Sequence, residues 1–140
     1  MTALQLGAAI GEGDIDPVDL TESYLERIER EDADHTVFLA VTAERARAEA
    51  AAAHQRAETG LRQSPLDGVP ISWKDLFDSA GTATTGGSDI FRDRVPKHDA
   101  VTLARATRAG MVCLGKTNLS EFAFSGLGIN PTFGTPVNPF

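Results

Sequence analysis

The chain has 140 residues, of which 41% are hydrophobic and 24% charged, enough for one ordinary globular domain with a buried core. Thirteen basic and twenty acidic residues give a formal net charge of -7, which disfavours direct binding to nucleic acid or to an anionic membrane. A single cysteine excludes a disulfide within the chain, no stretch is long enough for a membrane span, and a cytoplasmic protein is expected.

Two helices are predicted in the first 60 residues. Asp16 can cap a helix in which Pro17 takes the first position, and apolar residues then recur at helical spacing to about residue 30. A short apolar run at residues 37–41 follows. Residues 42–59 are rich in alanine, arginine and glutamate, which favour helix, and Gly60 can close that helix.

Sheet is predicted in the second part of the chain, where residues 69–73 form the first convincing strand and residues 81–88 a loop. Asp99 can cap a helix over residues 100–108, which Gly110 ends. Residues 111–114 form a short buried strand. A strand, a helix and a strand in this order indicate a βαβ crossover, and therefore an α/β fold.

Several smaller features complete this prediction. Cys113 lies in the apolar strand, where a buried small hydrophobic residue is expected rather than a reactive thiol. Asn118 with Glu121 can cap a further short helix. Asn130-Pro131 and Asn138-Pro139 are typical of turns.

Residues 110–117 read GMVCLGKT, which matches the spacing of a phosphate-binding loop. Such a loop follows a strand and consists of small residues, whereas a helix precedes Gly110 here and the next four residues are apolar and strand-like. Nucleotide binding is therefore the least favoured function. Lys116 and Thr117 are predicted to end the strand instead.

No cofactor or metal is expected. The three histidines, His35, His54 and His98, show no metal-ligand spacing. Asp75 and Asp78 follow a strand closely, a place where carboxylates are more often solvated or capping groups than a functional pair.

Lys74 ends the predicted strand and is the most informative residue of the chain. Side chains alternate along a strand, so Ser72 and Lys74 share one face while Ile71 and Trp73 share the other. This arrangement directs an ammonium group, beside a hydroxyl, inward or at a cleft. A lysine acts as a base near neutral pH only if its pKa falls from about 10.4 to about 7 or 8, which proteins sustain mainly where the neutral amine is used. The alternative is a snorkelling lysine at a strand end.

Two long segments resemble the amidase signature family. Residues 65–88, PLDGVPISWKDLFDSAGTATTGGS, resemble the block in which that family carries Gly-Val-Pro, a short apolar stretch and Lys-Asp. Residues 109–139, AGMVCLGKTNLSEFAFSGLGINPTFGTPVNP, resemble its next block. The resemblance implies that residues 1–140 form the N-terminal part of a single amidase domain. Residues 1–60 would be helical, and residues 61–140 would begin the α/β core with part of a mixed β-sheet.

The resemblance also implies the chemistry, which is hydrolysis of an amide by acyl transfer. Lys74 is its base and works with two serines, one of which follows a cis peptide bond. Both serines lie after the Asn-Pro that is here Asn138-Pro139, so this chain keeps only the lysine and is predicted to be inactive alone. Ser88 belongs to a separate glycine-serine turn and is not a candidate nucleophile.

Phe124 and Ser125 are the candidate substrate-binding residues, because the resemblance aligns residues 123–126 with the family's substrate channel. The alternative is that Phe122 and Phe124 are core aromatics and that Ser125 is a loop hydroxyl.

Three classes of function stay open. The first is an amidase that acts on a small-molecule amide, or the glutamine amidase subunit of a transfer-RNA-dependent amidotransferase. The second is a non-catalytic remnant or interaction fragment, and the third is a nucleotide-binding domain. As part of a larger fold, the chain is expected to expose strand edges and apolar surface that the remainder of the amidase domain covers, and a homo-oligomer stays open.

Overall fold

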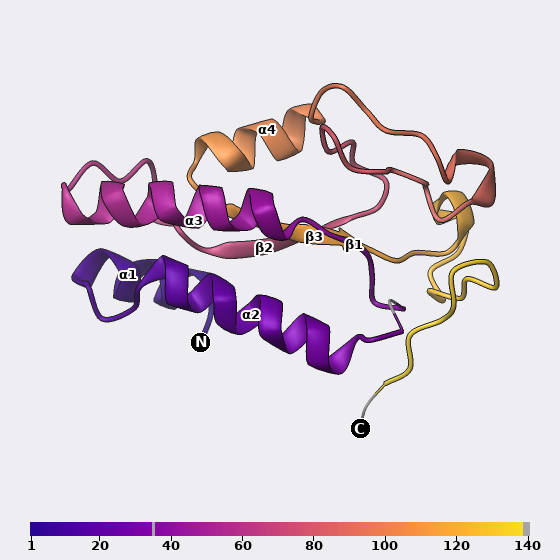
Figure 1. Ribbon diagram of the computed structural model, residues 1–140, viewed down its shortest axis with the longest axis horizontal. Helices are drawn as coiled ribbons and strands as arrows, with labels where there is room; N and C mark the ends of the chain where they lie inside the picture. The colour runs from indigo at the N-terminus through magenta and orange to yellow at the C-terminus, as the bar shows by residue number, and fades with distance from the viewer. Residues whose placement is uncertain (35, 139–140) are drawn as a thin grey trace.

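The computed structural model describes residues 1–34 and 36–138 (Figure 1). Its α-helices and strands are α1 (Ala3–Glu12), α2 (Pro17–Glu31), β1 (Phe38–Val41), α3 (Ala43–Glu58), β2 (Pro70–Lys74), α4 (Val101–Arg108) and β3 (Val112–Thr117). Two single turns of 3-10 helix are η1 (Asp89–Phe91) and η2 (Glu121–Ala123). The predicted α/β class is confirmed.

Helices α2 and α3 have the predicted bounds to within about one residue. The Asp16 carboxylate accepts a hydrogen bond of 2.7 Å from the backbone N–H of Val18, so this residue caps α2 as predicted. Helix α1 was not predicted from the residue pattern, although the resemblance implied that residues 1–60 are helical. It contains Gly7 and Gly11, which lower helix propensity, and Gly7 is required by packing because a Cβ atom there would lie 1.9 Å from the carbonyl oxygen of Pro65.

The sheet has the strand order β1-β3-β2, in which β3 runs parallel to β2 and antiparallel to β1. The segment from β2 through α4 to β3 is therefore the predicted crossover. Strand β1 was not predicted. Its four residues are all half-buried, so apolar and polar side chains do not alternate along it, and its pairing partners lie more than 70 residues away. Strand β3 extends to Thr117 as expected, and its residues from Val112 to Lys116 are all buried.

The core lies where α2 and α3 pack against each other and against β3. Helix α3 contributes small residues at the contact, so the backbones approach closely, and Figure 1 shows α2 and α3 running beside one another. The buried members of this cluster are Leu25, Ile28, Ala46, Ala50, Val112 and Leu114. This packing fixes the central strand, and through it the end of β2.

The predicted cap of α4 is wrong. The Asp99 carboxylate accepts hydrogen bonds of 2.9 and 2.8 Å from the two terminal nitrogens of Arg45 in α3, and one of 2.8 Å from the N–H of Ala80. Helix α4 begins at Val101, and Ala100 at its cap position provides no side-chain cap. The ion pair gives this carboxylate two charged donors, and it holds the pKa of the Asp99 carboxyl below its usual value.

The predicted capping pair after β3 is also wrong. The Asn118 side-chain N–H donates to the carbonyl oxygens of Thr36 and Gly134, each at 2.9 Å. Glu121 instead accepts a hydrogen bond from the hydroxyl of Ser88. Both side chains therefore join distant segments, an outcome that local sequence spacing does not reveal.

The turn predicted at Asn130 is confirmed. Its side-chain oxygen accepts hydrogen bonds from the N–H groups of Thr132 and Phe133. The second predicted turn includes Pro139, which lies outside the described residues. No helix in the described part of the chain is long and apolar enough to span a membrane.

Candidate functional site

Lys74 is the last residue of β2, and its side chain is exposed. Ser72 is exposed with it, whereas Trp73 is half-buried and packs edge-on against Phe77 with 5.3 Å between ring centroids. The predicted alternation is confirmed, but Lys74 does not point inward or into a cleft. Among the described residues its ammonium group has no hydrogen-bond or ion-pair partner. The physical reason is that β2 is an edge strand that packs mainly against β3.

A cleft of about 550 Å³ borders the same strand but stops short of Lys74. Pro70 and Ser72 of β2 form one wall, and Val137 from the C-terminal segment lies at its rim. Its other walls come from α2, β1 and β3 and include Tyr24 and Leu114. This partly apolar opening agrees with the expectation that the chain exposes surface for further elements to cover.

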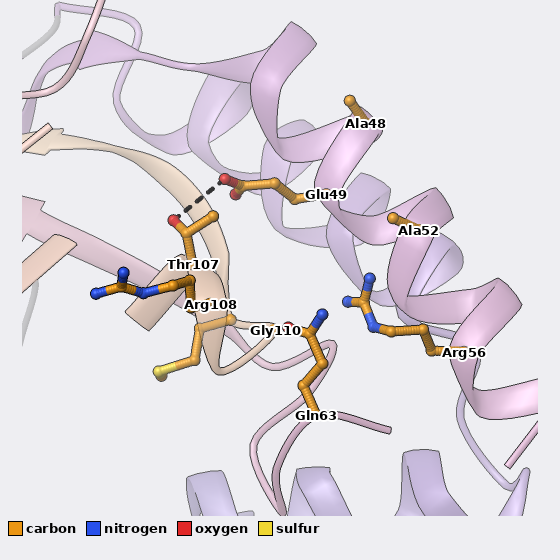
Figure 2. A pocket seen from close by; sticks show the side chains of 9 residues that line it. Ala48, Glu49, Ala52, Arg56, Gln63, Thr107, Arg108 and Gly110 are labelled. Atoms are coloured by element: carbon orange, nitrogen blue, oxygen red, sulfur yellow. Dashed lines mark hydrogen bonds between the residues drawn. The ribbon is translucent and has the colours of Figure 1, made fainter. Parts of the chain in front are cut away.

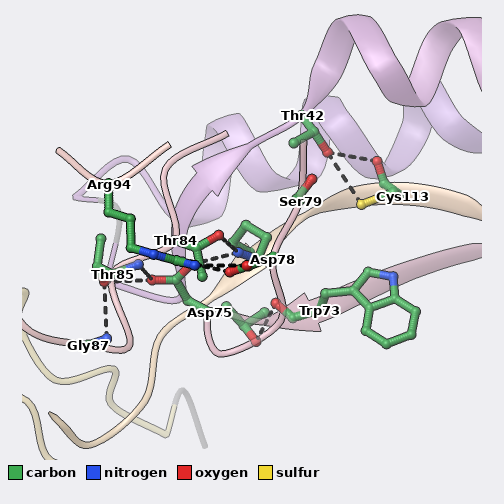
Figure 3. A network of polar contacts seen from close by, with 12 residues as sticks. Thr42, Trp73, Asp75, Asp78, Ser79, Thr84, Thr85, Gly87, Arg94 and Cys113 are labelled. Carbon is green, nitrogen blue, oxygen red and sulfur yellow. Dashed lines mark hydrogen bonds and ion pairs between the residues drawn. The ribbon is translucent and has the colours of Figure 1, made fainter. Parts of the chain in front are cut away.

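A buried polar network lies directly after Lys74 (Figure 3). The Lys116 ammonium group, 0% exposed, donates hydrogen bonds of 2.8 Å to the carboxylate of Asp75 and 2.8 Å to the hydroxyl of Thr84. The second Asp75 oxygen accepts hydrogen bonds from Thr85, at 2.9 Å from its N–H and 2.6 Å from its hydroxyl. The N–H of Gly87 donates to that hydroxyl in turn.

The interpretation of Asp75 as a solvated or capping carboxylate is wrong, because the residue is only 1% exposed. A sequence signal for this network existed, since Lys116 lies in a run of strand residues that are otherwise apolar or small. Asp78 does lie near the surface, where it pairs with Arg94 at 2.6 and 2.8 Å. That guanidinium lowers the pKa of the Asp78 carboxyl.

Ser88 is fully buried and serves the local structure. Its hydroxyl donates a hydrogen bond of 2.6 Å to the Glu121 carboxylate and accepts one of 3.3 Å from the N–H of Ile90 at the start of η1. These contacts agree with its omission from the candidate nucleophiles.

Phe124 and Ser125 lie on the surface, with Phe124 95% exposed. The alternative that Phe122 and Phe124 are core aromatics is wrong, since Phe122 is 49% exposed. Phe122 and Ala123 both have positive φ angles, 52° and 57°, which cost non-glycine residues about 1–3 kcal/mol each. A hydrogen bond of 2.7 Å from the Phe122 N–H to the carbonyl oxygen of Gly86 holds this turn. Such strain is concentrated at functional sites, so the segment stays a candidate for substrate binding.

A second cavity of about 400 Å³ lies between α3, α4 and the start of β3 (Figure 2). Two of its polar side chains, those of Glu49 and Arg56, already have partners. Glu49 accepts hydrogen bonds from the N–H of Cys113 at 2.7 Å and from the Thr107 hydroxyl, and Arg56 pairs with Asp67. This cavity therefore offers a ligand few polar groups besides the side chains of Gln63 and Arg108.

The GMVCLGKT segment forms the turn after α4, at Gly110, and the central strand β3 rather than a phosphate-binding loop. Within residues 1–34 and 36–138 no group of three metal-ligating side chains comes together. His35 lies outside these residues.

Cys113 is 1% exposed, which confirms the prediction of a buried thiol, and burial raises its pKa. A thiol whose pKa is higher in the folded than in the unfolded chain adds stability at pH values below the unfolded pKa of about 8.5, and this stability is lost as the pH rises through the folded value.

We expect a thiol reagent at pH 8 to modify Cys113 in the native chain at least about 100-fold more slowly than in urea, because the thiolate forms mainly after opening. The increase in absorbance on release of the aromatic thiolate measures the rate. Equal rates in the two solvents would contradict a buried thiol.

Comparison with known proteins gives a consistent result. A family model described as Amidase matches residues 19–140. A subunit of glutamyl-tRNA(Gln) amidotransferase from Streptomyces coelicolor is 39% identical over 140 residues, which cover 100% of this chain and 28% of that protein.

Solved structures agree. An inhibitor-bound complex, described as vestigial and as revealing the origins of an s-triazine catabolic enzyme, matches with a TM-score of 0.89 at 36% identity, over 96% of this chain and 30% of that one. A peptide amidase from Stenotrophomonas maltophilia matches with a TM-score of 0.79 at 34% identity, over 87% of this chain and 25% of that one. The chain thus spans less than a third of the length of these proteins.

Proposed function

Because the chain belongs to the Amidase family, we propose that it forms the N-terminal part of an enzyme that hydrolyses carboxylic amides by acyl transfer. Lys74 is the proposed general base. The observation that supports this role is its exposed position at the end of β2, inside the matched region. The chain's other lysine in the matched sheet, Lys116, is committed to a buried ion pair.

In the proposed mechanism, neutral Lys74 takes a proton, through a bridging serine, from a nucleophilic serine. The two serines come from the remainder of the domain. The activated oxygen attacks the amide carbonyl, backbone N–H groups stabilise the oxyanion, and the proton passes to the leaving amine. Water then hydrolyses the acyl-enzyme.

The exposure of the Lys74 side chain affects the amidase activity that we expect of the isolated chain. A general base acts on its nucleophile inside a site that the protein covers from bulk water. The remainder of the domain would provide this covering together with the serines. We therefore propose that the isolated 140 residues have no appreciable amidase activity.

Phe124 and Ser125 are proposed to line the substrate channel. Their exposure and the strained turn before them support this assignment. The substrate is a small amide if the protein is a free-standing amidase. It is glutamine if the protein, like its Streptomyces relative by name, is an amidotransferase subunit that supplies ammonia to a partner.

The test uses the complete reading frame that contains this chain. The purified product is assayed by ammonia release from glutamine and from aliphatic, aromatic and peptide amides, with and without the other amidotransferase subunits. Hydrolysis of at least one amide is the expected result, and the substrate distinguishes the two types of enzyme. Failure on every amide, with and without those subunits, would refute the proposal.

A further inference from the structure

The residue that follows Lys74 is held through both its backbone and its side chain. The Asp75 N–H donates a hydrogen bond of 2.9 Å to the carbonyl oxygen of Thr117 in β3, and the Asp75 carbonyl oxygen accepts one of 2.9 Å from the N–H of Gly86. Its carboxylate binds Lys116 and Thr85. Few hydrogen-bonding groups of this residue are therefore free to change partners.

Lys74 itself is fixed on both sides through the backbone. Its carbonyl oxygen accepts hydrogen bonds from the N–H groups of Leu76 at 2.7 Å and Phe77 at 3.1 Å. The preceding carbonyl, that of Trp73, accepts a hydrogen bond of 3.3 Å from the Thr117 hydroxyl. The proposed base therefore lies at the end of an edge strand, in a turn that backbone hydrogen bonds hold in place.

The ion pair does not contact Lys74 directly. In the register of the parallel strands Lys116 lies beside Trp73 and Lys74 beside Thr117, so the two lysines project from opposite faces of the sheet. Any influence of the pair on Lys74 therefore passes through the backbone of Asp75. Figure 3 shows Asp75 with its carboxylate turned toward Thr85.

Stability alone is a weak explanation for this pair. Two charges lose their hydration when they are buried, and a buried ion pair is often no more stabilising than apolar residues of the same volume. Here the pair joins the end of β2, the middle of the sheet and the loop at residues 84–87, three segments that meet beside the proposed base.

We propose that Asp75 and Lys116 are positioning residues that hold the backbone of Lys74 so that its amine meets the serine of the acyl-transfer site. This inference rests on the proposed function. A displacement of about 1 Å in a reacting group costs on the order of 100-fold in rate. The pair therefore contributes to turnover more than to substrate binding.

The test compares variants of the full-length enzyme. Asp75→Asn, and the uncharged pair Asp75→Asn with Lys116→Met, are expected to lower kcat by about 10- to 100-fold while KM changes less than about twofold. The double variant leaves no unpaired buried charge, so it is the variant most suited to keep the fold. Asp78→Asn is the matched control, because that carboxylate pairs with Arg94 near the surface.

A second measurement needs no activity. In the 140-residue chain, amide hydrogen exchange at Asp75 and Gly86 should become at least about tenfold faster in the double variant, while exchange at Val112, the first residue of β3, stays unchanged. Two results would overturn the positioning role and leave the proposed function standing. In both, the wild-type enzyme is active and the double variant is folded. The double variant then shows either an unchanged kcat or unchanged hydrogen exchange. An inactive wild-type enzyme would refute the proposed function itself, and the positioning role would fall with it.

Discussion

Replacement of Lys74 by alanine in the full-length protein is expected to lower kcat for amide hydrolysis by at least about 1000-fold. A catalytic set that acts as a unit loses most of its rate when one member is removed, and the residual activity comes from substrate binding and oxyanion stabilisation. The measurement is ammonia release under single-turnover and steady-state conditions. Because the Lys74 side chain is exposed and has no partner among the described residues, its loss should leave the fold intact.

Lys97→Ala is the matched control, since this lysine is also exposed and lies outside both helices and strands. It should keep kcat within about twofold. If the two variants unfold at the same temperature, the lower kcat of Lys74→Ala comes from the loss of the catalytic amine and not from loss of the fold. Substantial turnover by Lys74→Ala would remove the lysine from the mechanism.

The Asp67→Asn substitution is expected to reduce the free energy of unfolding by about 3 kcal/mol, which is the lower end of the effect of breaking a buried ion pair. The Asp67 carboxylate is 1% exposed and accepts hydrogen bonds of 2.8 and 2.6 Å from Arg56 and one of 2.7 Å from the N–H of Gln63. An amide presents one acceptor oxygen where the carboxylate presents two. Equilibrium urea unfolding of the 140-residue chain measures the change.

Glu22→Gln provides the contrast. Glu22 binds Arg47 in the same two-bond geometry, at 2.7 and 3.0 Å, but the pair is exposed to water. Its removal should change stability far less than Asp67→Asn does, because water and salt screen surface ion pairs. Equal losses in the two variants would show that burial does not decide the strength of these bonds.

The parts of the fold that are encoded locally could be predicted from the sequence. The bounds of α2 followed from Asp16 and Pro17, and those of α3 from a long run of helix-favouring residues. The crossover followed from the order of the elements around α4. The residue pattern did not reveal strand β1 or helix α1, because the first depends on pairing with a distant strand and the second contains a glycine that packing against residue 65 requires.

The candidate site shows the same division. Alternation along β2 placed Lys74 and Ser72 correctly on one face, yet the exposure of that face depends on what covers an edge strand. The partner of Asp75 lies 41 residues further along the chain, and that of Asp99 lies 54 residues earlier. Charged side chains choose partners through tertiary contacts, so local spacing misassigned both carboxylates as surface or capping groups.

The strand order β1-β3-β2 has a consequence for biosynthesis. On a ribosome, the parallel pair of β2 and β3 can close as soon as residues 112–117 have emerged, and β2 then has an open hydrogen-bonding edge within the described sheet. Another nascent chain can add to such an edge. A pause in translation shortly after this point would therefore prolong the interval in which neighbouring chains on one messenger can aggregate, and rapid elongation would protect the protein.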